Sequence, residues 1–242
     1  MIDIHSHILY GVDDGPKTLE RSLEMLDYAQ KDKITTLFAT SHFKPGLESD
    51  FSARYEELKP RAAERGIELI LGTEIDYVHL ATTRPLLTLG GSKFILVDMR
   101  QPYLEMSCSH VLYQLSLDGY TVIIAHPERL FMSPDLKIVH ELAEMDCFFQ
   151  LNASSIVGRH GGQAQHIAFS IIKAGLAHYV GSDAHSPRRN FAMSEARELV
   201  NKKFGGEVTE LLFEVNAQQL LKNEAPYLVT PPKRKWYQIF KR

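Results

Sequence analysis

Many side chains in this sequence can bind metal ions, and they recur at intervals that suggest a shared site. Imidazole and carboxylate groups gathered together suit Zn²⁺, Mn²⁺ or iron better than Ca²⁺ or Mg²⁺. Carboxylates that lie close together also repel one another unless cations lie between them. The candidates exceed the needs of one ion, so we predict two or three ions. The candidate ligands are His5, His7, Asp14, His42, Glu74, Asp98, His126, Asp183 and His185.

Two pairs of these residues have a spacing that favours joint binding. His5 and His7 are two residues apart, and so are Asp183 and His185. On an extended chain, residues two apart point to the same side. Each pair can therefore hold ions at one centre, and Glu74 is a candidate to bridge two ions.

Asp13 and Asp14 compete for one role in the predicted site. Asp14 precedes Gly15 at an expected turn, so we predict that Asp14 is the ligand. Asp13 is expected to support a ligand from behind or to cap a helix.

Seven short apolar or β-branched runs are predicted to be strands that position these side chains. They are Ile2–Ile4, Thr35–Thr40, Ile67–Leu71, Phe94–Val97, Thr121–Ala125, Cys147–Leu151 and His178–Gly181. Helical patterns lie between them, for example the apolar stripe of Leu19, Leu23, Leu26 and Ala29. This alternation indicates parallel strands with helical crossovers, and we expect a closed or nearly closed barrel rather than an open sheet. No Gly-x-Gly-x-x-Gly follows the first run, which argues against dinucleotide binding.

The ends of these runs bring the candidates to one place. Six of the seven runs are followed by a candidate ligand, and the sixth run is followed by the amide of Asn152. In a barrel of parallel strands, the carboxyl ends meet at one mouth, where active sites are found. A single histidine at a strand end is most often a hydrogen-bonded structural residue. A purely structural role does not explain why nine residues that can bind metal lie at the carboxyl ends of the predicted strands.

Composition narrows the classes of function. The chain has 242 residues, 44% hydrophobic and 24% charged, as expected for a soluble globular protein. The formal net charge of −3 gives no basic field for nucleic acid. No apolar run is long enough to cross a bilayer, and the N-terminus does not resemble a signal peptide, so we expect a cytoplasmic protein.

Several motifs together resemble the polymerase-and-histidinol-phosphatase (PHP) superfamily. They are His5-Ser6-His7, Asp13-Asp14-Gly15-Pro16, Thr40-Ser41-His42, Glu74, His126-Pro127-Glu128-Arg129 and Ser182-Asp183-Ala184-His185. Within it, the first two motifs resemble the bacterial manganese-dependent protein-tyrosine phosphatases of capsular and exopolysaccharide gene clusters. The resemblance implies a distorted (β/α)₇ barrel with a trinuclear site, in a single domain over residues 1–225. A basic, aromatic tail would follow over residues 226–242.

The resemblance also implies a role for each residue. His5, His7, Glu74 and Asp183 would hold the first ion; Glu74, Asp98 and His126 the second; and Asp14, His42 and His185 the third. Arg129 and Arg189 would bind phosphate. Asp98 stands where this group of phosphatases usually has Glu, and a shorter loop after His185 leaves Arg188 as the alternative to Arg189.

The activity implied by the resemblance is hydrolysis of phosphotyrosine by water activated at Mn²⁺. The substrate would be a cytoplasmic tyrosine kinase of polysaccharide synthesis. A histidinol-phosphate or other small-molecule phosphatase and a phosphodiesterase or nuclease remain alternatives, although the acidic composition argues against a nuclease. A metal-stabilised binding module of a kinase complex is the non-enzymatic alternative, and two arginines beside a complete ligand set argue against it.

Other nucleophiles fit the sequence poorly. A thiol phosphatase needs Arg six positions after its cysteine, but Gln114 follows Cys108 and Ala153 follows Cys147 at that distance. Both cysteines are expected to be packing residues. No Gly-x-Ser-x-Gly supports a serine triad.

Residues outside the predicted site receive simpler interpretations. The remaining histidines, including His140, His160 and His178, are expected in surface or capping roles; His160 lies in a glycine-bearing loop that could form a rim of the mouth. The tail from Lys233 to Arg242 could contact anionic lipid weakly, but a solvated terminus is the main expectation.

Overall fold

The computed structural model describes residues 1–80, 85–99, 108–130, 135–187 and 191–230. Within them the chain forms eight strands: β1 (Ile2–Ser6), β2 (Thr36–Ala39), β3 (Glu68–Leu71), β4 (Glu74–Asp76), β5 (Phe94–Asp98), β6 (Thr121–Ala125), β7 (Phe148–Asn152) and β8 (Tyr179–Gly181). One sheet has the order β1-β2-β3, and the other runs from β4 to β8 in sequence order. Every paired strand is parallel to its neighbour, as the alternation with helices predicts.

Backbone hydrogen bonds join the two sheets at both seams and close the barrel. At one seam, the N–H of Asp183 donates to the carbonyl oxygen of His5 at 2.8 Å. At the other, the N–H of Glu74 donates to the carbonyl oxygen of Thr40 at 3.1 Å, and the Glu74 carbonyl accepts from the N–H of Phe43 at 2.7 Å. The predicted α/β barrel is confirmed.

The structure contains one short strand, β4, that the sequence analysis did not predict. β3 ends at Leu71 and β4 begins at Glu74, so the chain leaves the first sheet at Gly72 and Thr73 and enters the second. A Cβ on Gly72 would lie 2.7 Å from a methyl group of Leu89, which explains the glycine at this close approach. The predicted run Ile67–Leu71 corresponds to β3, so β4 is the additional strand where seven runs were predicted, and Glu74 lies within it.

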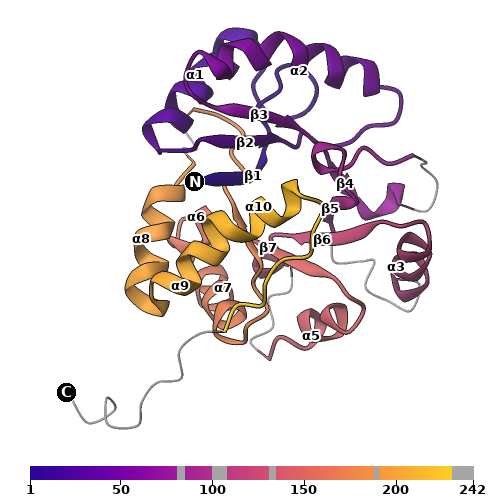
Figure 1. The fold of residues 1–242 in the computed structure, drawn as a ribbon, viewed down its shortest axis with the longest axis vertical. Helices are drawn as coiled ribbons and strands as arrows, with labels where there is room; N and C mark the ends of the chain where they lie inside the picture. Colours follow the sequence, from indigo (N-terminus) through magenta and orange to yellow (C-terminus); the bar gives the residue numbers. More distant parts are fainter. Residues whose placement is uncertain (81–84, 100–107, 131–134, 188–190, 231–242) are drawn as a thin grey trace.

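Helices cover the outside of the barrel. α1 (Leu19–Lys31) and α2 (Glu48–Ala63) lie over the β1-β2-β3 sheet (Figure 1). The predicted apolar stripe of α1 faces the core, with Leu26 and Ala29 fully buried. The other described helices are α3 (Cys108–Leu117), α4 (Pro127–Leu130), α5 (Lys137–Ala143), α6 (Ala153–Ile156), α7 (Gly162–Lys173), α8 (Met193–Phe204), α9 (Gly206–Glu210), the π-helix η4 (Leu211–Val215), α10 (Asn216–Leu221) and the 3₁₀ turns η1 (Tyr77–His79) and η2 (Leu89–Gly91).

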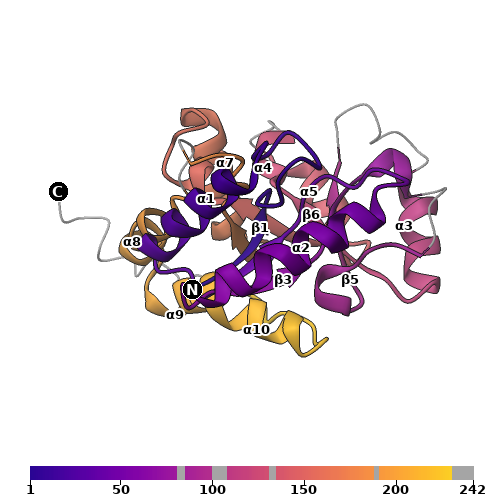
Figure 2. The ribbon, with the colours of Figure 1, turned by 90° about the horizontal axis from the view of Figure 1, so that it is seen from above.

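The barrel interior has an apolar floor and an open polar end. Ile2, Phe94 and Tyr179, which begin β1, β5 and β8, form an inner cluster with Ala217 and Leu220 of α10. α10 therefore covers the amino-terminal ends of the strands. Figure 2 shows α10 on the side of the molecule opposite to α4, which starts directly after β6 and so marks the carboxyl ends. The floor leaves only that second end available for a polar site.

The C-terminal part of the described chain packs on the barrel. Val229 is buried in the outer core, and the N–H of Tyr227 donates to Oδ1 of Asn216 at 2.8 Å. The predicted boundary at residue 225 stays a prediction, and residues 231–242, with the basic and aromatic tail residues, lie outside the described part. None of the described helices is long and apolar enough to span a membrane.

One histidine outside the predicted site departs from expectation. His178 is buried rather than on the surface, and its Nδ1 accepts a hydrogen bond from the N–H of Phe149 at 3.2 Å. Burial lowers the pKa of His178 to about 4. His140, by contrast, is exposed as expected.

Candidate active site

The structure brings all nine predicted ligand residues together at the carboxyl ends of the strands. Their nitrogen and oxygen atoms form four overlapping groups, and within each group the atoms lie within 4.8 Å of one another. The groups are His7, Asp14, His42 and His185; His5, His7 and Glu74; His5, His126 and Asp183; and Glu74, Asp98 and His126. Such overlapping sets of imidazole and carboxylate donors fit several transition-metal ions at one centre.

A bulge in β1 positions the two N-terminal histidines. The pairing of β1 with β2 shifts register between Asp3 and Ser6, and the Nε2 atoms of His5 and His7 lie 3.1 Å apart. Oδ1 of the buried Asp3 accepts hydrogen bonds from the N–H groups of His5 (3.1 Å) and Ser182 (2.9 Å). The Asp3 carboxylate thus replaces a backbone partner at the seam between β1 and β8. Burial raises its pKa to about 6.

Glu74 lies at the centre of the cluster. Its Oε1 is 3.0 Å from Nε2 of His126, and its Oε2 is 3.0 Å from Nδ1 of His42. Nε2 of His5 and of His7 lie 3.5 and 3.4 Å from the same carboxylate. Although burial opposes ionisation, the charges of the surrounding imidazoles hold the pKa of Glu74 well below its usual range. A carboxylate with imidazoles on both oxygens has the geometry required to bridge two ions.

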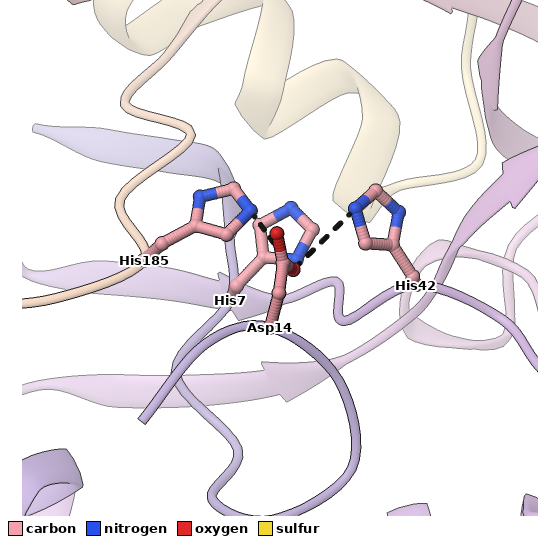
Figure 3. Close-up of side chains that lie close together, drawn as sticks. All are labelled: His7, Asp14, His42 and His185. Atoms are coloured by element: carbon pink, nitrogen blue, oxygen red, sulfur yellow. Dashed lines mark ion pairs between the residues drawn. The ribbon is translucent and has the colours of Figure 1, made fainter. Parts of the chain in front are cut away.

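Asp14 lies in a group with three imidazoles, one of which, His7, also belongs to the group that contains Glu74. Figure 3 shows His42 and His185 on either side of Asp14, with His7 behind it. Oδ1 of Asp14 lies 3.3 Å from Nε2 of His185 and 3.6 Å from Nε2 of His42. The Asp14 side chain is 68% exposed, so this group faces the pocket opening.

Asp13 has a different environment from Asp14. Its Oδ2 lies 2.7 Å from Nδ1 of His7 and accepts from the N–H of His42 at 2.9 Å. Its Oδ1 accepts from the N–H of Gly15 at 2.8 Å. Burial opposes ionisation, but the hydrogen bond from His7 holds the pKa of Asp13 well below its usual range. Asp13 is therefore an anchor behind His7, and Asp14 presents its carboxylate to the pocket.

Two candidate ligands have backbone conformations that cost energy. His126 has φ of +35° and Asp183 has φ of +53°, in the left-handed region. Such conformations cost roughly 1–3 kcal/mol each in residues other than glycine and concentrate at functional sites. The fold therefore maintains strain at the points where β6 and β8 deliver their side chains.

Arg129 lies beside the carboxylate cluster. Its Nη1 is 2.5 Å from Oδ2 of Asp183, which also accepts from Nδ2 of Asn152 at 3.0 Å. The N–H of Asn152 in turn donates to Oε1 of the buried Glu128 at 3.0 Å. Asn152 thus holds Asp183 in place from the end of β7. Arg189 and its alternative Arg188 lie outside the described residues, so the second phosphate-binding arginine stays a prediction.

The imidazoles of the cluster differ in their tendency to be protonated, and burial lowers the pKa of His185. Burial opposes protonation of His126, but the hydrogen bond that its Nε2 donates to Glu74 raises its pKa to about 9. Burial likewise opposes protonation of His7, yet its carboxylate neighbours raise its pKa well above the usual value. A cation bound to these ring nitrogens would compete with their protons, so metal affinity is expected to increase with pH.

The pocket also contains residues that the sequence analysis missed. It has a volume of about 740 Å³, and Ser154 and Arg159, which the sequence analysis did not single out, line it. Seven of the nine candidate ligands, Arg129 and His160, whose loop was considered as a rim of the mouth, also line it. Gln150, inside β7, places its Oε1 2.8 Å from Nδ1 of His5. Strand alternation could have suggested Gln150, since a buried amide in a predicted strand needs partners. No comparable signal in the sequence singles out Arg159.

Neither cysteine can act as the nucleophile in this site. Cys108 and Cys147 are buried and free, and neither lines the pocket that contains the cluster. Burial raises their pKa values to about 11 and about 12, so both remain thiols at neutral pH.

Comparisons with known proteins agree with this geometry. Residues 1–222 match the family described as capsular polysaccharide synthesis, CpsB/CapC. The tyrosine-protein phosphatase YwqE of Bacillus subtilis is 32% identical over 254 aligned residues, covering 99% of both chains. A chain from the crystal structures of YwqE and of CpsB from Streptococcus pneumoniae, described as unique metal-dependent tyrosine phosphatases, superposes with a TM-score of 0.85, covering 97% of this chain and 100% of that one at 32% identity. Histidinol phosphate phosphatase from Lactococcus lactis shares the fold, with a TM-score of 0.53 at 13% identity over 96% of this chain and 98% of that one.

Proposed function

Because this chain belongs to the capsular polysaccharide synthesis CpsB/CapC family, we propose that it removes phosphate from tyrosines of a kinase that regulates capsular or exopolysaccharide synthesis. By homology the chain is a metal-dependent tyrosine-protein phosphatase. The observation that carries the proposal is the convergence of nine imidazole and carboxylate groups in one cluster, seven of which line a single pocket with Arg129. The kinase partner and a cytoplasmic location are the finer parts of the proposal.

The donor groups support a site for two or three cations, which we propose to be Mn²⁺, with iron, Zn²⁺ or Mg²⁺ as alternatives. His5, His7, Glu74 and Asp183 would hold the first, Glu74, Asp98 and His126 the second, and Asp14, His42 and His185 the third. When bound, such cations would supply an activated water and neutralise charge on a phosphate ester. Asp98 already lies in one group with Glu74 and His126, although this group of phosphatases usually has a longer carboxylate there.

The chain's own residues would orient both the ligands and the substrate. Asp13 accepts a hydrogen bond from a protonated Nδ1 of His7, and this contact directs Nε2 of the same ring to the cluster. Arg129 lines the pocket and would bind phosphate oxygens; Asp183, which accepts a hydrogen bond from Asn152, pairs with its guanidinium. A tyrosine hydroxyl has a pKa near 10, so this leaving group needs only modest assistance. No covalent intermediate is required.

A substrate panel tests the proposal. Purified protein is stripped of metal, reloaded with Mn²⁺, Zn²⁺ or Mg²⁺, and assayed with p-nitrophenyl phosphate, a phosphotyrosine peptide, histidinol phosphate and bis-p-nitrophenyl phosphate. We expect metal-dependent cleavage of the two aryl monoesters, inhibition by a chelator, and dephosphorylation of the autophosphorylated kinase from the same gene cluster. Cleavage of the diester without the monoesters would contradict the proposal.

A matched pair of histidine variants links this activity to the cluster. His5→Ala removes a buried group of the cluster and should lower turnover by orders of magnitude. His140→Ala changes an exposed histidine of α5 and should leave turnover unchanged. Equal loss of activity in both variants would point to a general effect on folding rather than to the proposed site. A metal count on each variant separates loss of ions from loss of chemistry.

A further inference from the structure

The pocket extends beyond the metal-binding groups. Leu130, Ser154, Arg159 and His160 line it, and none of these residues belongs to the donor groups. Its volume of about 740 Å³ falls within the range of roughly 300–1,000 Å³ found for sites that enclose whole organic ligands. A phosphate group alone therefore leaves much of this pocket for neighbouring parts of a substrate.

The loop that carries Arg159 and His160 has a defined shape. The N–H of Arg159 donates to the carbonyl oxygen of Ser154 at 2.8 Å, and the N–H of Gly161 donates to the carbonyl oxygen of Gly158 at 3.1 Å. Gly158 and Gly161 have φ of +85° and +92°, which a glycine adopts without strain. The Nδ1 of His160 lies 3.0 Å from the hydroxyl of Ser155. These contacts hold both side chains at the pocket wall.

Arg159 has an ion-pair partner that an acidic substrate can replace. Its Nη2 donates to Oε2 of Glu195 on α8 at 2.6 Å, and the two side chains are 40% and 60% exposed. Exposed pairs of this kind contribute little stability, so their exchange for another carboxylate costs little. A guanidinium also has several donors in a planar fork, which matches the geometry of a carboxylate.

We propose that Arg159, with His160 beside it, binds an acidic side chain near the phosphotyrosine of a peptide substrate. The loop at residues 158–161 then selects phosphotyrosines that lie in acidic sequence, while the cluster and Arg129 act on the phosphate. This inference rests on the proposed phosphotyrosine activity and adds the substrate feature that the pocket recognises.

Two phosphotyrosine peptides of equal length test this subsite. One has Glu and Asp on both sides of the phosphotyrosine, and the other has Gln and Asn in their place. For the Mn²⁺-loaded wild type at low salt, we expect kcat/KM to be roughly three- to tenfold higher for the acidic peptide, mainly through KM. The ratio should fall to about one in Arg159→Ala and invert in Arg159→Glu, and high salt should reduce it in the wild type.

Arg197 provides a matched control. Its side chain is also 40% exposed and also pairs with a glutamate, Glu210, but it does not line the pocket. Arg197→Ala should keep the wild-type ratio, and Glu195→Gln should increase it because a competing carboxylate is lost. Metal content and p-nitrophenyl phosphate turnover are measured for every variant to correct for the active fraction.

The outcomes separate this inference from the function on which it rests. Equal kcat/KM for the two peptides in the wild type, or an unchanged ratio in Arg159→Ala, would overturn the subsite and leave the phosphatase intact. Failure of the metal-loaded wild type to cleave either peptide would overturn the proposed function, and the subsite with it.

Discussion

Replacing Asp13 by Asn should weaken metal binding without removing a ligand. The Asp13 carboxylate accepts three hydrogen bonds, from Nδ1 of His7 and the N–H of His42 at Oδ2 and from the N–H of Gly15 at Oδ1. An asparagine has one acceptor oxygen, so its NH₂ group must face at least one of these donors. The space is also confined, because a Cβ on Gly15 would lie 2.9 Å from Oδ1 of Asp13.

The size of the effect follows from these contacts. One buried donor left without an acceptor costs about 1–3 kcal/mol. Partners that orient a metal-binding histidine typically contribute 10- to 100-fold in metal affinity, which corresponds to about 1.4–2.7 kcal/mol. Both routes predict that Asp13→Asn raises the apparent Kd for Mn²⁺ by roughly 10- to 100-fold, because His7 loses its fixed tautomer and orientation.

The assay combines calorimetric titration with Mn²⁺, which gives the Kd, and elemental analysis, which gives the number of bound ions. Asp14→Asn is the comparison variant. We expect Asp13→Asn to bind the wild-type number of ions at saturating Mn²⁺ and to recover most of its activity there. Asp14→Asn should lose the ion held with His42 and His185. The reasoning is refuted if Asp13→Asn lowers the ion count while Asp14→Asn does not, or if Asp13→Asn binds Mn²⁺ as tightly as the wild type.

Three further predictions test other parts of the site and fold. Arg129→Ala should lower kcat/KM for a phosphotyrosine peptide by roughly 10²–10³-fold, because the variant lacks the fixed cation that stabilises charge on the transferring phosphate. Steady-state kinetics at saturating metal check this prediction. A loss below tenfold would contradict the role of Arg129. Cys108→Ser should retain activity with the fold intact, since burial keeps this thiol protonated, and an inactive but folded variant would reverse the proposed mechanism. The pKa of His178 falls from 6.5 unfolded to about 4 folded, so the neutral ring stabilises the protein above pH 6.5 and this contribution is lost as pH falls toward 4. The difference of about 2.5 pKa units corresponds to about 3 kcal/mol of unfolding free energy. Urea unfolding with chelator present should show that His178→Asn lacks this loss of stability in acid. Identical dependence of stability on pH in the variant and the wild type would argue against it.

Local patterns in the sequence were sufficient to predict the barrel and the membership of the cluster. Apolar runs alternating with helical stripes indicate parallel strands, and the residue after each strand must lie at the same end of the barrel. The two-residue spacing of His5 and His7 predicts that their side chains meet, and their Nε2 atoms lie 3.1 Å apart. These inferences succeed because strand alternation and parallel pairing are properties of short segments.

The sequence could not predict features that depend on close approach between distant segments. β4 begins after the close approach of Gly72 to Leu89, and the bulge in β1 lies where Asp3 reaches Ser182 across the seam. The position of Arg159 in the pocket depends on a loop shape set by its own hydrogen bonds and by α8.

The different roles of Asp13 and Asp14 show this division most clearly. The sequence determined that two adjacent carboxylates follow β1, and the turn expected at Gly15 favoured Asp14 over Asp13 as the ligand. Only the tertiary structure decided between them, because it buries Asp13 against His7 and turns Asp14 toward His185. Adjacent residues have nearly the same local spacing, so their roles depend on neighbours that the fold supplies from distant parts of the chain.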